Sequence, residues 1–382
     1  MNPLIEVRNL VVEYPLRRGL RAWLGGGGKR RFRAVNGVSF AIGKGAALGL
    51  VGESGCGKST LGRALLRLER AAAGSVVFEG RPIEGLSGDG LLALRRRAQM
   101  IFQDPLGALN SRLSVRSALS EVIRVHRIHP RDAEAAAIAD LLRDVGLPLE
   151  LIDRRPRSLS GGQCQRVVIA RALAMGADFL VADEPTSALD VSVQAQIMSL
   201  FKRLREERHL TLLFISHDLR VVRYLCDTVA VMYLGRIVEY GAAEAVFSHP
   251  RHPYTQALMA SAPRLGGLAA AHAAIRGEPP SPADPPRGCP FHPRCPFAME
   301  VCRCDPFPEE RVVDNVAVWC HLYDAAASEA VTGGERASRT MDGERAAPVS
   351  AQGAAEMTAR NVPIGFQAAL PQGDGRRGGD TP

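Results

Sequence analysis

The amino-acid sequence predicts an α/β fold in which helices cover a largely parallel β-sheet. Short, unbroken apolar runs bounded by turn-forming residues are typical of strands that are buried on both faces. Such runs are ALGLV (47–51), QMIF (99–102), FLVAD (179–183) and TLLFIS (211–216). Segments with the apolar spacing of helices lie between them, and this alternation is typical of α/β proteins.

Local patterns predict further elements. Residues 1–14 (MNPLIEVRNLVVEY) are expected to form a first strand, because charged residues interrupt the apolar run that a signal peptide would need. A helix is predicted after Asp132, where apolar residues recur with helical spacing until Gly146 and Pro148. The same spacing predicts a helix through residues 197–204.

Composition limits the class of protein. The 382 residues suffice for two domains, or for one large domain with appendages. No segment reaches the roughly 18 apolar residues of a membrane-spanning helix, so none is expected. The net charge of +8 is unevenly spread, because residues 17–33 hold seven basic residues and no acid. This segment is interpreted as a solvated Gly-rich loop or as a contact for an acidic surface such as anionic lipid.

Changes in composition divide the chain. Residues 1–265 are predicted to form the main domain, with a mostly helical subdomain inserted at about residues 106–178. A Pro-rich linker and a cysteine-containing segment follow over residues 266–323. Residues 324–382 have Phe366 as their one aromatic residue and are expected to be disordered, because they lack the side chains of a core.

A glycine-rich loop is the clearest functional signal. GESGCGKST fits G-x-x-x-x-G-K-[ST] between a predicted strand and a predicted helix, which is the context of a phosphate-binding P-loop. Its glycines let backbone N–H groups face phosphate oxygens at a helix N-terminus. Lys58 is expected to reach the β- and γ-phosphates, and the Ser59 hydroxyl to bind Mg²⁺. The expected phosphate-binding residues are Gly52, Glu53, Ser54, Gly55, Cys56, Gly57, Lys58, Ser59 and Thr60.

Two acidic residues end the strand FLVAD. Asp183 can hold Mg²⁺, directly or through water, and the adjacent Glu184 can polarise the attacking water. Hydrolysis needs both, because the metal neutralises phosphate charge while the carboxylate orients and deprotonates the nucleophile. Behind a P-loop, this pair predicts a nucleotide-hydrolysing enzyme with a P-loop NTPase core.

Further motifs appear in the order of a known family. LSGGQ (159–163) resembles the signature motif of ATP-binding cassette (ABC) proteins. Gln103 resembles the Q-loop glutamine, SALD (187–190) the D-loop, and His217 the switch histidine. Tyr14 is the candidate for the aromatic ring that stacks on adenine, with a core position as the alternative. The resemblance implies an ATPase with the catalytic residues Lys58, Gln103, Glu184 and His217, and the Mg²⁺ ligands Ser59, Gln103 and Asp183.

The resemblance also implies a dimer, because two ABC cassettes form a head-to-tail sandwich around ATP. Ser160 is expected to cap the helix that begins near Gly161 and to aim its N–H groups at the γ-phosphate bound by the partner. Asp190 is expected at the dimer seam. Cys164 departs from the family, where Gln or Arg is more usual, and little effect is expected. The signature residues expected to bind nucleotide are Ser160, Gly161, Gly162 and Gln163.

The chain resembles one subfamily more closely, the ATP-binding subunits of oligopeptide and dipeptide importers, over about residues 4–323. QDPLGALNSR, HPRHPYTQALMASAP and GCPFHPRCPFAMEVC carry the likeness. It implies a subunit that energises peptide uptake from the cytoplasmic face of the inner membrane, as a peripheral protein. The expected partners are two transmembrane permease subunits, a second ABC ATPase that is identical or homologous, and, indirectly, a solute-binding protein.

Two alternatives stay open. Nickel, glutathione or oligosaccharide could replace peptide, because in this subfamily the solute-binding protein and the membrane subunits determine specificity. A more distant alternative is an ABC ATPase that acts on nucleic acid or the ribosome. Such relatives tend to carry two cassettes, a coiled-coil insertion or a DNA-binding module. This chain has one cassette and no long heptad run, so no nucleic-acid partner is expected.

The cysteines of residues 288–304, together with Cys320, suggest a metal site. Their spacing, C-x₅-C-x₆-C followed by Cys320, differs from the C-x₂-C pairs of zinc ribbons. Disulfides are disfavoured in the cytosol, which is the expected compartment. An Fe–S cluster, a zinc site that includes His292 or His321, and unmetallated packing cysteines all stay open.

The subfamily resemblance favours the cluster. It implies that Cys289, Cys295, Cys302 and Cys320 ligate a 4Fe–4S cluster, with Cys304 outside the pattern and zinc less favoured. The expected role is structural, because the cluster would pin an extension that has no core of its own.

Overall fold

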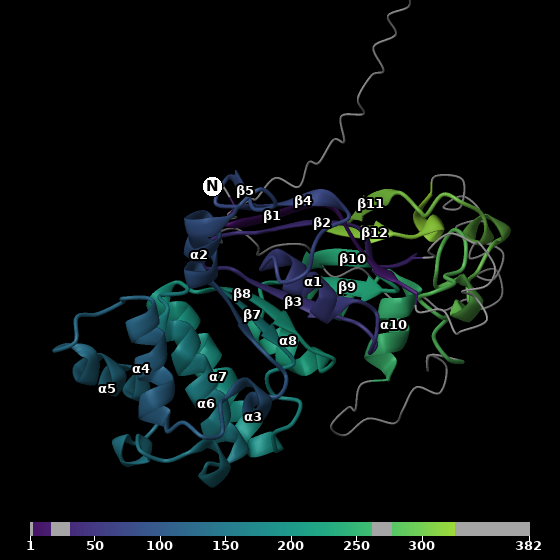
Figure 1. Ribbon diagram of the computed structural model, residues 1–382. Coiled ribbons are helices and arrows are strands. Elements are labelled where there is room, and N and C mark those ends of the chain that lie inside the picture. The colour runs from purple at the N-terminus through teal and green to yellow at the C-terminus, as the bar shows by residue number, and fades with distance from the viewer. Residues whose placement is uncertain (1–2, 17–30, 262–276, 325–382) are drawn as a thin grey trace, which may run out of the picture. The chain divides into compact units, whose positions relative to one another are not determined.

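The main β-sheet brings the predicted strands side by side. In the computed structural model, which describes residues 3–16, 31–261 and 277–324, this sheet has the order β11-β12-β10-β9-β3-β8-β7-β6 (Figure 1). β3 (Ala47–Val51), β8 (Thr211–Ile215), β7 (Phe179–Asp183) and β6 (Ala98–Ile101) are the four predicted strands. Neighbours among them pair in parallel, so their carboxyl ends meet at one edge, where α/β proteins bind ligands.

A second, antiparallel sheet has the order β2-β1-β4-β5. It is formed by β1 (Ile5–Pro15), β2 (Arg31–Ile42), β4 (Ala73–Phe78) and β5 (Arg81–Pro82), and it confirms the first predicted strand. The loop predicted over residues 17–33 is wrong at its end, because residues 31–33 belong to β2. Their place is set by pairing with β1, where Arg33 lies opposite Glu13 and forms a 3.1 Å ion pair with it. Residues 17–30 lie outside the described part of the chain.

Helices flank the strands. They are α1 (Lys58–Leu65), α2 (Gly88–Arg97), α3 (Pro105–Ala108), α4 (Val115–Val125), α5 (Glu134–Asp144), α6 (Gly161–Ala174), α7 (Val191–Arg208), α8 (Leu219–Leu225), α9 (Ala243–Ser248) and α10 (Pro253–Ala260). α5 and α7 are the two helices that the apolar spacing predicts. α3 to α6 lie between β6 and β7 in the chain and pack on one another (Figure 1).

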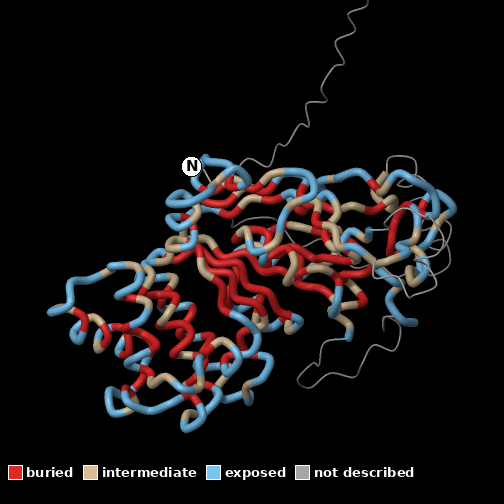
Figure 2. Tube along the Cα trace, viewed as in Figure 1, coloured by how far each residue is buried: buried red, intermediate tan, exposed pale blue. Residues whose placement is uncertain are grey.

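The central strands of the main sheet, β3, β7 and β8, are buried on both faces (Figure 2). In β3, Leu48 and Leu50 belong to an apolar cluster shared with the antiparallel sheet. Ala47 and Val51 belong to a second cluster, shared with the helices. A strand covered on both sides needs apolar residues at every position, which explains the unbroken run ALGLV.

The cysteine segment is continuous with the main sheet. The main sheet continues past β3 with β9 (Thr228–Tyr233) and β10 (Arg236–Ala242). Next to β10 lies β12 (Val316–Trp319), which pairs with β10 on one side and with β11 (Glu310–Val313) on the other. Cys289, Phe291 and Cys302 also belong to the main apolar cluster. The extension therefore has no separate core but shares that of the main domain. Because residues 262–276 and 325–382 are not described, the domain boundaries at 265 and 323 stay predictions.

Candidate active site

A pocket of about 320 Å³ opens where the P-loop meets the ends of the parallel strands. Most of the residues predicted to hold nucleotide line it together: Tyr14, Ser54, Gly55, Cys56, Gly57, Lys58, Ser59, Thr60, Gln103 and Glu184. Gly52 and Glu53 do not line this pocket. One pocket therefore unites predicted residues that lie as much as 170 positions apart in the chain, which is the separation of Tyr14 and Glu184.

The P-loop is held closely by neighbouring backbone. Gly57, the N-cap of α1, has φ 106°, and a Cβ there would lie 2.1 Å from the Ala34 carbonyl oxygen. A Cβ at Gly52 would lie 2.2 Å from the Met232 carbonyl oxygen. Only glycine fits at either position. No side chain caps α1, which leaves its N-terminal N–H groups available to an anion.

Lys58 and Ser59 link the loop to its surroundings. The Lys58 side chain is buried, and its ammonium donates to the carbonyl oxygens of Gly52 and Glu53, each at 2.8 Å. The Ser59 hydroxyl donates to Asp183 Oδ1 at 2.9 Å. Burial raises the pKa of Asp183, and the Ser59 hydrogen bond opposes that rise. A hydroxyl and a carboxylate at this distance are oxygen donors of the kind that Mg²⁺ prefers, so the site fits that ion.

Two other predicted catalytic residues, Gln103 and His217, contact the Glu184 carboxylate. Gln103 Nε2 lies 3.4 Å from Glu184 Oε2, and His217 Nδ1 lies 3.3 Å from the same oxygen. Glu184 has φ 46°, a backbone conformation that non-glycine residues rarely adopt and that is frequent at active sites. The structure therefore brings a carboxylate, an amide and an imidazole together; Glu184 and Gln103 line the P-loop pocket, and His217 lies beside Glu184.

The end of the pocket at Tyr14 is aromatic and basic. The Tyr14 and Phe32 rings lie 5.7 Å apart at 34°. The sequence interpretation did not single out Phe32, Arg33 or Pro282, which also line the pocket. Phe32 and Arg33 fall in the stretch interpreted as a loop, so only the alternation of side chains in β2 could have found them.

The signature segment lies outside this pocket. Ser160 caps α6 as predicted, accepting from the Gln163 N–H at 3.2 Å, while Gln163 Oε1 accepts from the Ser160 N–H at 2.9 Å. Asp190 caps α7 in a similar way, accepting from the Val193 N–H at 2.9 Å. Gly161 and Gly162 pack closely against Leu189 and Val193. Within one chain, the signature residues and the P-loop do not share a site.

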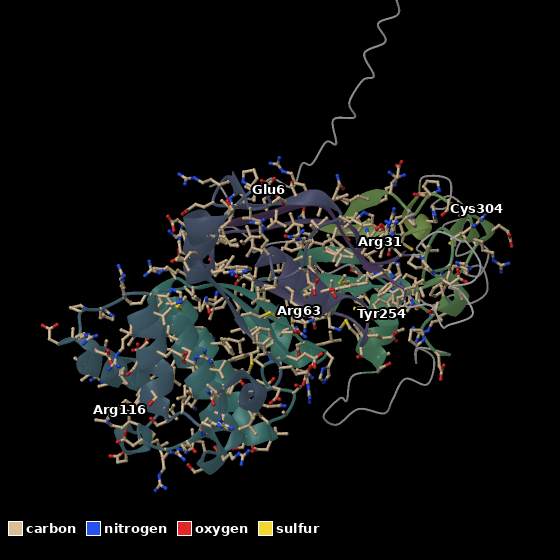
Figure 3. All side chains as sticks on the ribbon, viewed as in Figure 1. Glu6, Arg31, Arg63, Arg116, Tyr254 and Cys304 are labelled. Atoms are coloured by element: carbon tan, nitrogen blue, oxygen red, sulfur yellow. The ribbon has the colours of Figure 1, made fainter. Side chains whose placement is uncertain are left out.

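The cysteines fall into two groups. Cys289, Cys302 and Cys320 are buried and Cys295 is half-buried, whereas Cys304 is exposed at the outer side of the segment (Figure 3). Burial, together with a smaller effect of the thiols of Cys289, Cys295 and Cys302, raises the pKa of Cys320 to about 12. Three of the four predicted ligands are therefore buried and the fourth is half-buried, whereas Cys304 is exposed.

No completed metal site is present in the described part of the chain. No group of three or more His, Cys, Asp or Glu side chains in it is arranged to hold a metal ion. His292 Nδ1 is engaged with the Cys289 carbonyl oxygen at 2.9 Å, and His321 Nδ1 with Asp324 at 2.7 Å. His321 Nε2 is buried with no partner among the described residues. The nature of any metal at these cysteines stays a prediction.

Comparison with known proteins identifies the family. Residues 35–187 match the ABC transporter family, and residues 238–302 match the family described as oligopeptide/dipeptide transporter, C-terminal region. The oligopeptide transport ATP-binding protein AppF of Bacillus subtilis (strain 168) is 44% identical over 84% of this chain and 97% of its own length. The di/tripeptide transport ATP-binding protein DppF of Pseudomonas aeruginosa (strain UCBPP-PA14) is 43% identical over 84% of this chain and 98% of its own.

Solved structures confirm the predicted fold. CbiO1 of Clostridium perfringens, part of an ABC transporter complex, has a TM-score of 0.56 and 29% identity over 65% of this chain and 92% of its own. The ATP-binding cassette MJ0796, in a dimeric post-hydrolysis state with ADP and phosphate, has a TM-score of 0.54 and 26% identity over 63% of this chain and 98% of its own. The chain belongs to the ABC transporter ATPases, in the group that carries the oligopeptide/dipeptide transporter C-terminal region.

Proposed function

We propose that this chain binds and hydrolyses ATP to energise an ABC importer for dipeptides or oligopeptides. The observation that carries the proposal is the pocket in which the P-loop, Gln103 and Glu184 converge. The relatives named for oligopeptide and di/tripeptide transport support the choice of solute.

The side chains in and beside the pocket would share the tasks of hydrolysis. The Lys58 ammonium would exchange its two carbonyl partners for the β- and γ-phosphates. Mg²⁺, held by Ser59, Asp183 and Gln103, would supply neutralisation of phosphate charge. Glu184 would accept a proton from the attacking water, and His217, beside it, would orient the γ-phosphate.

A second cassette would complete the site. Ser160 organises the N-terminus of α6, but that N-terminus lies outside the pocket of its own chain. A head-to-tail partner, identical or homologous, would bring its own α6 N-terminus to the γ-phosphate, where N–H groups favour an anion. Asp190, at the start of α7, would lie at the seam between the two subunits.

The surface that would meet the membrane subunits is a groove between the main sheet and the helices α4 and α6. This docking groove, of about 510 Å³, is lined by Leu66, Leu68, Leu92, Arg95, Ala98, Gln99, Met100, Phe102, Ala108, Val122, His126, Val168, Arg171, Ala172 and Met175. Leu68, Leu92 and Phe102 are large apolar side chains that remain exposed there. Clustered exposed apolar groups are typical of interaction sites.

The chain would reach the inner membrane through these partners. Within residues 3–16, 31–261 and 277–324, no helix has the length and apolar content needed to cross a membrane. A peripheral position on the cytoplasmic face, next to two permease subunits and without a nucleic-acid partner, follows from the proposed role. A solute-binding protein would deliver the peptide on the opposite side.

The cysteine segment would hold a 4Fe–4S cluster through Cys289, Cys295, Cys302 and Cys320. The burial of Cys289, Cys302 and Cys320, the half-burial of Cys295 and the exposure of Cys304 support this set. Zinc is the alternative, supported by the buried, unpartnered Nε2 of His321.

Co-expression with candidate permease genes tests the transport proposal. The chain should co-purify with two polytopic membrane proteins, and a peptide-loaded binding protein should stimulate its ATPase activity in proteoliposomes. Stimulation by DNA or ribosomes instead would contradict the proposal.

A further inference from the structure

A buried guanidinium joins the cysteine segment to the P-loop. Arg294 lies in a short 3-10 turn (His292–Arg294) and donates to both Glu53 carboxylate oxygens, at 2.8 and 3.0 Å. Its side chain is 6% exposed and that of Glu53 is 22% exposed. Two parallel N–H···O bonds fix both the distance and the orientation of the pair, so Glu53 has little freedom to turn.

Arg294 is itself held firmly. Its guanidinium also donates to the Tyr233 hydroxyl at 3.2 Å and to the Gly277 carbonyl oxygen at 3.0 Å. Phe291, three residues before it, packs edge-on against Tyr233 with ring centroids 5.3 Å apart. These contacts tie Arg294 to the end of β9 and to the core, so it can act as a rigid support for the loop.

Glu53 connects Arg294 to Lys58, the lysine expected to bind phosphate. The Glu53 carbonyl oxygen is one of the two acceptors of the Lys58 ammonium, and the Glu53 N–H donates to the Tyr254 hydroxyl at 2.8 Å. If the Glu53 side chain lost its partner, the loop backbone at Glu53, whose carbonyl oxygen holds Lys58 before nucleotide binds, would be free to shift. The chain of contacts therefore runs from Arg294 through Glu53 to Lys58.

We propose that Arg294 is a positioning residue of the phosphate-binding loop, through which the cysteine segment sets the affinity for ATP. This inference rests on the proposed ATP site. Pro282, from the Pro-rich linker that precedes the cysteine segment, also lines the nucleotide pocket, so the linker and the segment each contribute to the site.

Nucleotide binding and steady-state kinetics of the purified full chain test the proposal, with Mg²⁺-ATP as the probe. Arg294→Ala should raise the Kd and KM for ATP about tenfold, with a smaller change in kcat, because the loop is misplaced while Glu184 is untouched. The Kd and KM of Arg294→Lys should lie between those of wild type and Arg294→Ala. An ammonium keeps the positive charge but lacks the two parallel N–H donors of a guanidinium. Arg303→Ala is the matched control, since Arg303 lies in the same segment with an exposed side chain.

A double-mutant cycle separates positioning from general destabilisation. Glu53→Gln and Arg294→Ala should each weaken ATP binding, and the double variant should be no weaker than Arg294→Ala alone. Additive losses would overturn the proposal, as would a folded Arg294→Ala variant with a Kd within about twofold of wild type. If Arg294→Ala does not fold, the cycle is run with Arg294→Lys. Failure of wild-type protein to bind ATP would overturn the proposed function itself.

Discussion

The Ser59 hydroxyl donates to Asp183 Oδ1 at 2.9 Å, which joins the first turn of α1 to the last residue of β7. The two residues lie 124 positions apart, yet both are carried by elements of the parallel core. Ser59 lines the nucleotide pocket together with Gln103 and Glu184, and His217 lies beside Glu184.

Glu184→Gln should preserve ATP binding and reduce hydrolysis by about 10²- to 10⁴-fold, because the amide cannot take a proton from water. ATP should then hold the protein as a dimer. Phosphate release and light scattering with ATP measure the two effects. Glu150→Gln, at an exposed glutamate, is the control. Near-normal turnover in Glu184→Gln would exclude Glu184 as the base.

Asp183→Asn should abolish Mg²⁺-dependent hydrolysis but stabilise the nucleotide-free protein at neutral pH. Burial raises the pKa of Asp183 above the value of an unfolded chain, so the folded state binds the proton more tightly. The resulting stabilisation is present at low pH and is lost as the pH rises through the raised pKa. Asn mimics the protonated form, and the melting temperature at pH 7 should rise on the order of 2 °C.

Thermal melts from pH 4 to pH 8 without Mg²⁺ measure this effect. The difference in melting temperature between Asp183→Asn and wild type should increase with rising pH. The control variant Asp89→Asn, at an exposed residue, should show no such trend. If this difference in melting temperature decreased as the pH rises, the Asp183 carboxylate would be stabilised in the folded state, which contradicts the prediction.

Leu68→Glu should leave the ATPase activity of the isolated subunit unchanged and weaken binding to the permease subunits by about tenfold or more. A charge in the docking groove would have to be desolvated against an apolar partner, which is costly. Leu68 is 47% exposed, and the control Leu149, outside the groove, is 53% exposed. Pull-down with the permease subunits measures the binding. An equal loss of binding in Leu149→Glu would contradict the proposal that the docking groove binds the permeases.

Anaerobic purification should give a brown protein that contains iron and sulfide. Cys320→Ser should lose the absorbance and the iron, because one of four ligands is gone, whereas Cys304→Ser should keep both. Iron analysis and visible spectra measure this outcome. A colourless wild-type protein with stoichiometric zinc would show that the cysteines form a zinc site and not a cluster. A wild-type protein without metal would show that the cysteines only pack in the core.

Local features were predicted well from the sequence. The four parallel strands appear at their apolar runs, and Ser160 caps α6, because strand burial and helix capping depend on residues that are close in the chain. Most of the predicted P-loop residues, with Tyr14, Gln103 and Glu184, line one pocket, and they could be predicted because the order of the motifs resembles that of a known family.

The sequence by itself determined the fold class, the P-loop and the identity of most pocket residues. Only the tertiary structure decided that residues 31–33 pair with β1, that β12 joins the main sheet, and that Arg294 pairs with Glu53. Glu53 and Arg294 lie 241 positions apart, and no local periodicity links them. Such pairs depend on which strand edges and buried charges meet when the chain packs, and burial then makes the contact specific.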